Sequence, residues 1–172
     1  MGEKMQNNKM MKYRPTQICD NIESVDLNDL KTKNIQGIFL DVDNTLFDDT
    51  LTITDEVDSW LKKAISMGFK LCILSNTRSS KKVQNLRQRY DILGIHMAAK
   101  PKQKGFKIAQ TLVGMDKEKL CIIGDQLFTD VLGGNKFGIM TILVKPISKK
   151  ELIFTRMKRP FENMVLKKVM EK

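Results

Sequence analysis

Two aspartates separated by one residue, Asp41 and Asp43, are the residues whose types and spacing most clearly indicate chemistry in this chain. They follow the apolar run Ile38–Leu40, so both carboxylates stand just past the end of an expected buried strand. Like charges held this close resist ionising together, and such a pair is typical of a site that handles a hard cation or a phosphate. A polar strand-to-loop corner would explain the pair if it stood alone.

Matching polar residues recur at the ends of three later apolar runs. They are Ser75, Asn76 and Thr77 after the second expected strand, Lys100 and Pro101 after the third, and Gly124, Asp125 and Asp130 after the fourth. Ligands of doubly wound sheets bind beyond the carboxyl ends of the strands. We therefore expect these residues to form one shared site.

These residue types suit phosphoryl transfer. Mg²⁺ prefers oxygen ligands, which Asp41, Asp125 and a backbone carbonyl can supply. Asp41 can attack phosphorus and form an aspartyl-phosphate, while Asp43 can protonate the leaving alkoxide and then deprotonate the incoming water. Ser75 and nearby backbone N–H groups can bind the phosphoryl oxygens, and Lys100 supplies a point charge between nucleophile and phosphate.

The elements that must position these residues follow from the hydrophobic pattern. Short apolar runs alternate with segments of helical periodicity, which predicts βαβ units and an α/β fold around a parallel sheet. The expected strands are residues 35–40, 69–74, 95–99, 120–123 and 139–144.

Helix boundaries can be read from capping residues. Thr54 can cap a helix that ends at Gly68, Ser79 or Ser80 can start a second, and Gly114 can close a third. A fourth, shorter helix would use Phe128, Val131, Leu132 and Asn135, and an amphipathic terminal helix would span residues 160–170, with Phe161, Met164, Val165 and Val169 on its apolar side.

Length and charge suggest how the chain is divided. We expect one catalytic core over residues 35–146, an N-terminal extension over 1–34 and a basic helical extension over 147–172. The net charge of +10 belongs mainly to the ends, since residues 145–172 carry nine Lys or Arg against three acids. Basic extensions on a near-neutral body fit an anionic partner or a solubilising surface.

Several classes of site are disfavoured. The three cysteines show neither metal-ligand nor disulfide spacing, and His96 is the only histidine, so a multi-histidine metal site or a histidine base is nearly excluded. No apolar run approaches the length needed to cross a bilayer, and the N-terminus has no apolar signal core. We expect a cytoplasmic protein, peripheral to the membrane if its substrate lies there.

Taken in order, the four motifs resemble those of the haloacid dehalogenase (HAD) phosphatases. They read Asp41-Val42-Asp43-Asn44-Thr45, then Leu74-Ser75-Asn76-Thr77, then Lys100-Pro101, then Gly124-Asp125 with Asp130. Each is weak alone, but four in order after expected strands are specific. The chain looks most like subfamily IIIA and, within it, the YqeG-like group. The resemblance implies a HAD-like Rossmannoid three-layer αβα sandwich with a central parallel sheet.

The resemblance also implies catalytic roles. Asp41 would be the nucleophile, Asp43 the general acid and base, and Lys100 the residue that steadies the charges. Ser75 and Asn76 would bind the substrate phosphate. Lys102 and Lys104 are rivals for the Lys100 role, although they lie where the next helix should begin.

The cofactor implied by the resemblance is Mg²⁺. Its ligands would come from Asp41, Asp43 and Asp125, and Asp130 would be a further ligand or a residue that supports them. Three basic residues follow the second motif: Arg78, Lys81 and Lys82. They either contact substrate or lie on the solvent-exposed surface at the start of a helix.

No cap domain is expected over this site. Only 29 residues separate Thr45 from Ser75 and only 23 separate Asn76 from Lys100, and one helix and one strand fill each interval. An open site suits a substrate too large to enclose, such as a phosphoprotein, a nucleic-acid end or a lipid head group at an anionic membrane surface. An oligomeric neighbour could also act as the lid.

Our leading substrate is a lipid phosphomonoester, because YqeG-like proteins are similar to a phosphatidylglycerophosphate phosphatase of the same subfamily. The first alternative is a phosphatase of a soluble metabolite or phosphoprotein. A second, from another class, is a basic nucleic-acid-binding protein with a vestigial site. A receiver-like phosphoaspartate switch is a third, but Asp43 argues against it, since a switch gains nothing from a group that speeds water attack.

Overall fold

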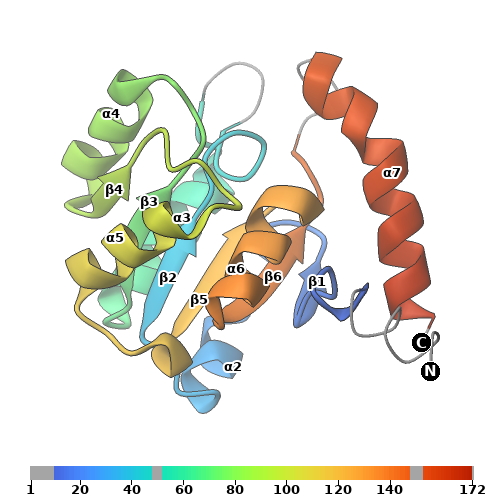
Figure 1. Cartoon of the computed structure of the whole chain (residues 1–172). Helices are drawn as coiled ribbons and strands as arrows, with labels where there is room; N and C mark the ends of the chain where they lie inside the picture. Colours follow the sequence, from blue (N-terminus) through green and yellow to red (C-terminus); the bar gives the residue numbers. More distant parts are fainter. Residues whose placement is uncertain (1–9, 48–51, 148–152, 172) are drawn as a thin grey trace.

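A six-stranded parallel sheet forms the centre of the molecule (Figure 1). The structure, a computed structural model, describes residues 10–47, 52–147 and 153–171, with the side chains of 153–159 left out. The strands are β1 (Gln17–Cys19), β2 (Gly37–Leu40), β3 (Lys70–Leu74), β4 (Leu93–Ile95), β5 (Leu120–Gly124) and β6 (Met140–Val144). Their order across the sheet is β1-β6-β5-β2-β3-β4, so β5, β2 and β3 are neighbours at its centre.

Helices cover both faces of this sheet. The helices are α2 (Leu27–Thr32), α3 (Asp55–Ser66), α4 (Ser80–Tyr90), α5 (Gln103–Val113), α6 (Leu132–Phe137) and α7 (Ile153–Met170), with a 3₁₀ turn, η1 (Lys117–Lys119), and a π-helical turn, η2 (Leu127–Val131). Apolar residues of α2, α3 and α4 pack on one face and those of α5 and α6 on the other. The expected three-layer αβα sandwich is therefore confirmed.

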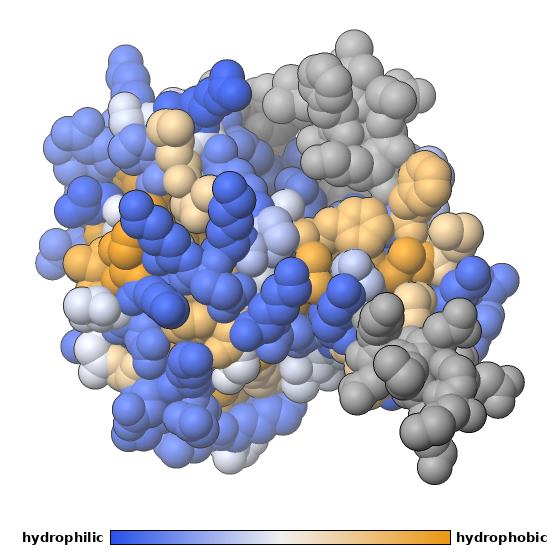
Figure 2. Space-filling model, viewed as in Figure 1, coloured by the Kyte–Doolittle hydropathy of each residue, from blue (hydrophilic) through white to orange (hydrophobic). Residues whose placement is uncertain are grey.

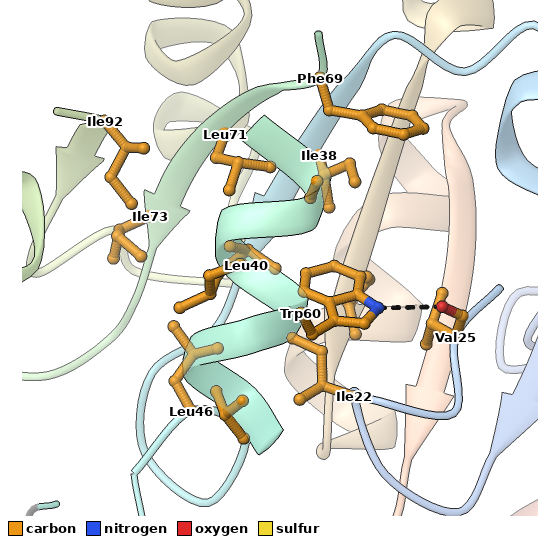
Figure 3. Close-up of a cluster of buried hydrophobic side chains, with 14 of the residues drawn as sticks. Ile22, Val25, Ile38, Leu40, Leu46, Trp60, Phe69, Leu71, Ile73 and Ile92 are labelled. Atoms are coloured by element: carbon orange, nitrogen blue, oxygen red, sulfur yellow. Dashed lines mark hydrogen bonds between the residues drawn. The ribbon is translucent and has the colours of Figure 1, made fainter. Parts of the chain in front are cut away.

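Successive residues of β2 show how the sequence produces these two layers. Ile38 and Leu40 lie in the cluster with α2, α3 and α4, whereas Phe39 lies in the cluster with α5 and α6. A strand buried on both faces is a continuous apolar run, because its side chains alternate between faces. In the first layer, Trp60 of α3 donates its indole N–H to the carbonyl of Val25 at 2.9 Å (Figure 3).

Most expected helix boundaries are confirmed. Thr54 caps α3 by accepting from the amide of Val57, and Ser79 caps α4 by accepting from the amide of Lys82. Gly114 closes α5 with φ 66°, a conformation that glycine adopts without steric cost. Within α5, Phe106, Ala109 and Val113 are buried, whereas Leu112 is exposed.

The fourth expected helix is divided into η2 and α6. Its two glycines are needed for packing: a Cβ on Gly133 would lie 2.7 Å from the Phe106 ring, and one on Gly134 would lie 2.5 Å from Thr141.

Two strands differ from the expectation. The strand expected over residues 95–99 is wrong beyond its first residue, since β4 ends at Ile95 and the backbone turns at Met97 and Ala99, whose φ values are 50° and 56°. No strand was expected before residue 35, yet β1 pairs in parallel with β6 at the sheet edge.

The ends of the chain also join this architecture. Helix α7 packs on η2, with Val165 and Leu166 against a small cluster of Leu127, Val131 and Leu143. Phe161 and Met164, expected on its apolar side, are exposed. Among the residues that the structure describes, one helix, α3, lies between β2 and β3, and one helix, α4, lies between β3 and β4. Neither interval contains an additional folded domain in its described part, as expected for a fold without a cap. None of the helices described is long and apolar enough to cross a membrane.

Candidate active site

The expected site residues meet at the carboxyl edge of the three central strands. Asp41 directly follows β2, Ser75 follows β3, and Asp125 follows β5. Asp41 extends the β2–β5 pairing by one residue, since its amide donates to the carbonyl of Ile123 at 3.0 Å. All three polar side chains are buried, although each lies at the end of a strand.

Lys100 joins two acids at the centre of this site. Its Nζ lies 2.7 Å from Oδ1 of Asp41 and 2.6 Å from Oδ1 of Asp130. The Lys100 side chain is 1% exposed, whereas Lys102 and Lys104 are both exposed, so only Lys100 of the three rivals reaches the buried acids. Burying a lysine ammonium group and two carboxylates removes them from water, which costs free energy. The contacts between the three groups must offset this cost.

Asn76 holds the Lys100 backbone from both sides. Its amide Nδ2 donates to the Lys100 carbonyl at 3.0 Å, and its Oδ1 accepts from the Lys100 amide at 2.7 Å. This contact ties the loop after β3 to the loop after β4. The Asn76 side chain is therefore a support for the lysine, and its expected contact with substrate phosphate remains a prediction.

Ser75 is buried at the end of β3, and its expected contact with substrate phosphate remains a prediction. Its Oγ accepts from the amide of Thr77 at 3.2 Å, which leaves the hydroxyl hydrogen to donate to another group. The side chain is 1% exposed at the end of the strand beside β2.

Three carboxylates form a compact oxygen cluster. Ligand atoms of Asp41, Asp125 and Asp130 lie within 4.8 Å of one another. Asp130 is drawn inward because its Oδ2 accepts from the Gln126 amide at 3.1 Å, and only a glycine at 124 leaves room, since a Cβ there would lie 2.3 Å from Asp130 Cγ. A set of close carboxylate oxygens matches the ligand preference of Mg²⁺.

Burial and charge act in opposite directions on these groups. Burial raises the pKa of Asp41 from its usual 3.8 to about 6, although Lys100 opposes this and Asp130 adds to it. Burial by itself would lower the pKa of Lys100, but Asp130 and Asp41 outweigh it and raise that pKa above its usual range. The lysine is thus charged, and the carboxylate is poised to bind either a proton or a cation.

Asp43 lies outside the buried cluster. Its side chain is partly exposed, and its Oδ1 accepts a charged hydrogen bond from Lys82 Nζ at 2.7 Å. Lys82 comes from the first turn of α4, so the contact joins that helix to the turn after β2. The turn itself needs Asn44, whose φ of 64° is tolerated by asparagine better than by most residues.

Comparison with known proteins agrees with this geometry. A family model described as HAD-hydrolase-like matches residues 97–151. The Bacillus subtilis protein named Probable phosphatase YqeG is 36% identical over 155 residues, which cover 90% of each chain. The chain belongs to the YqeG-like phosphatases of the HAD superfamily.

Two further proteins, one similar in sequence and one in fold, are more distant from this YqeG-like phosphatase. Phosphatidylglycerophosphate phosphatase 1 of Arabidopsis thaliana is 27% identical over 159 residues, spanning 86% of this chain but only 45% of the plant protein. The crystal structure of an uncharacterized protein from Listeria monocytogenes serotype 4b has the same fold, with a TM-score of 0.55 and 18% identity over 78% of this chain and 99% of that one.

One contact at the site of this YqeG-like phosphatase could not be expected from the sequence. Glu162 of α7 is buried, and its Oε1 accepts from the amide of Phe128 at 3.1 Å, three residues after Asp125. Its sequence surroundings are those of a basic surface helix, so no signal pointed to the loop that carries Asp125. The sequence left the role of Lys82 open, and the structure places it on Asp43.

Proposed function

We propose that this phosphatase is a Mg²⁺-dependent phosphomonoester hydrolase that works through an aspartyl-phosphate on Asp41. The observation that carries the proposal is the buried contact of Asp41 with Lys100, beside Asp125 and Asp130. A carboxylate held between a fixed cation and a cation-binding cluster is suited to attack an anionic phosphate.

The acidic cluster gives the residues that would hold the ion. Asp41 and Asp125 belong both to the set expected from the sequence and to the cluster, and Asp130 adds a third carboxylate. The Asp43 carboxylate contacts Lys82, so the oxygen that Asp43 would give is that of its backbone carbonyl. When bound, Mg²⁺ would reduce the negative charge of the phosphate and so lower its repulsion of the nucleophile.

The protein groups then act in two steps. An oxygen of Asp41 attacks phosphorus as the bond to the leaving oxygen breaks, and Asp43 gives a proton to that oxygen. Water then loses a proton to Asp43 and attacks the aspartyl-phosphate, which releases phosphate and restores the Asp41 carboxylate. Throughout, the Ser75 hydroxyl and backbone N–H groups hold the phosphoryl oxygens, and Lys100 offsets their charge.

We further propose a lipid phosphomonoester, phosphatidylglycerophosphate, as the substrate. The name of the Arabidopsis relative supports this choice. So does the surface of α7: Phe161 and Met164 are 64% and 48% exposed, and Lys167 and Lys168 lie exposed on the same helix. Figure 2 shows apolar side chains gathered over this helix. Exposed apolar residues beside lysines favour an anionic lipid surface.

The test is phosphate release from phosphatidylglycerol vesicles that contain phosphatidylglycerophosphate. We expect turnover that needs Mg²⁺ and is lost in Asp41→Asn, which keeps the size of the side chain but removes the nucleophile. Soluble phosphosugars and phosphopeptides serve as comparison substrates. Robust turnover of these, with none on vesicles, would refute the lipid substrate, and full activity of Asp41→Asn would refute the mechanism.

A further inference from the structure

A groove of about 890 Å³ lies between α4 and the described residues Phe47, Thr52 and Ile53, and one of its lining residues, Lys82, contacts the proposed catalytic acid Asp43. Phe47, Ile53 and Leu86 give it apolar walls, and Lys81, Lys82 and Arg89 give it three cationic groups. Its volume is within the range of small-molecule sites. The proposed chemistry assigns no step to the residues of this groove. Its one link to the catalytic residues is the contact of Lys82 with Asp43.

The position of the groove places it on the side of the site where the leaving group is expected. Asp43 would protonate the oxygen that leaves phosphorus, so whatever is attached to that oxygen must extend past Asp43. Lys82 lines the groove and lies 2.7 Å from Asp43, so the groove begins where the leaving group emerges. The groove therefore faces the leaving group rather than the phosphoryl group.

The cations of the groove differ in how far they are already paired. Arg89 lies 2.6 Å from Asp58, a carboxylate that also accepts from the Tyr90 hydroxyl, and Lys82 is engaged by Asp43. Lys81 is exposed and forms no ion pair with any residue that the structure describes. The described residues that line the groove include no acid. Among the charged side chains that the structure describes along the groove, Lys81 is therefore the cation most available to bind an anion.

We propose that this groove is a leaving-group subsite for phosphomonoesters whose leaving group carries a second anionic group next to an apolar part. Lys81 and Lys82 bind the second anion, and Phe47, Ile53 and Leu86 contact the apolar part. The proposal rests on the proposed function, because it takes Asp43 as the acid that faces the leaving oxygen. A phosphodiester-bearing lipid and its water-soluble head group share the second anion, and only the lipid also has the apolar part.

Two substrates with the same phosphomonoester end distinguish an effect on the subsite from an effect on the chemical steps. Glycerol 3-phosphate has a phosphomonoester on glycerol and no second anion, whereas glycerophosphoglycerophosphate adds a phosphodiester to the same glycerol. We expect Lys81→Gln to lower kcat/KM for the second substrate roughly tenfold, as loss of one charged contact does. It should leave the first unchanged, and Lys81→Arg should preserve both values.

A matched control comes from α5. Lys107→Gln removes the same charge from an exposed helix position outside the groove and should change neither substrate. A parallel experiment measures kcat/KM for phosphatidylglycerophosphate in phosphatidylglycerol vesicles. Its comparison with the soluble head group shows which of the two supplies the anion that Lys81 binds. The selective loss in Lys81→Gln in either arm supports the subsite. An equal loss on both soluble substrates, or no loss in any arm, overturns it.

Failure of the proposed function gives a different result. If Asp41→Asn is inactive and wild type hydrolyses glycerol 3-phosphate, the function stands whatever Lys81→Gln does. If wild type hydrolyses neither substrate, calorimetric binding of glycerophosphoglycerophosphate to wild type and to Lys81→Gln decides the subsite alone. Weaker binding to the variant supports it, and equal binding overturns it.

Discussion

The Asp41 carboxylate is buried beside Lys100 and two further acids, and these surroundings set how it exchanges protons and cations. Burial raises its pKa from 3.8 to about 6, against the opposing effect of Lys100. In the folded, metal-free protein this acid therefore keeps its proton to higher pH than it would in the unfolded chain. The contribution of Asp41 to stability is accordingly lost as pH rises from about 4 to about 6.

This titration predicts how Mg²⁺ affinity depends on pH. The ion binds the carboxylate form, so a proton on Asp41 competes with it. We expect the apparent dissociation constant for Mg²⁺ to rise about tenfold per pH unit below about pH 6 and to be nearly constant above about pH 7. Calorimetric titration across this range measures it. Asp43→Asn, outside the buried cluster, should keep the dependence, and persistence of the dependence in Asp41→Asn would assign it to another group.

Which residues gather at the site could be predicted, whereas their contacts could not. Asp41, Ser75 and Asp125 each follow a buried strand, and parallel strands end at the same edge, so the pattern alone brings them together. The pairing of Lys82 with Asp43 and the double hydrogen bond of Asn76 to Lys100 depend on loop paths and rotamers. No spacing in the sequence encodes these.

At the scale of elements, α7 matters because it contacts the loop that carries Asp125. Buried Glu162 accepts from the Phe128 amide, and Val165 and Leu166 pack beside η2. We expect Glu162→Ala to lower the free energy of unfolding by about 1–3 kcal/mol, because it leaves the partly buried Phe128 amide without this acceptor. Glu162→Gln keeps an acceptor oxygen and should lose less. Urea denaturation measures both.

The control for this prediction lies on the same helix. Glu171 is largely exposed and pairs with Lys167 across one turn, an interaction that contributes little to stability. Glu171→Ala should therefore change the free energy of unfolding by less than about 0.5 kcal/mol. A loss as large in Glu171→Ala as in Glu162→Ala would show that general helix propensity, rather than the contact with the loop, causes the effect.

Central elements of this fold are easier to predict than edge elements. The strands β2, β3 and β5 are buried on both faces, so their sequences are nearly continuous apolar runs. By contrast, β1 and β4 are three-residue edge strands whose residues are partly buried or, in the case of Ile18, exposed. Their apolar content is too small to distinguish them from loops, and their extent is set by the neighbouring strand. The sequence accordingly missed β1 and displaced β4.

At the scale of the whole molecule, two apolar layers pack on opposite faces of one sheet. Each layer contains one buried cysteine, whose reaction with a thiol reagent can measure the opening of that layer. Cys121 of β5 faces the layer of α2, α3 and α4, whereas Cys72 of β3 faces the layer of α5 and α6. Cys19 is partly exposed on the edge strand β1. Thiolates are the reactive form, and burial raises the pKa of Cys72 to about 12 and that of Cys121 above its usual range.

These positions predict how the molecule unfolds. Helices of both layers pack on the same central strands, so losing one layer exposes strands that the other needs for support. We expect Cys19 to react with a thiol reagent in native conditions, and Cys72 and Cys121 to react only through global opening, with equal opening free energies and equal urea dependence. Mass spectrometry of labelled peptides measures all three, and Cys19→Ser should remove only the fast reaction. If Cys72 opened at lower free energy than Cys121, the α5–α6 layer would separate first, and the sheet would not unite the two layers into one cooperative unit.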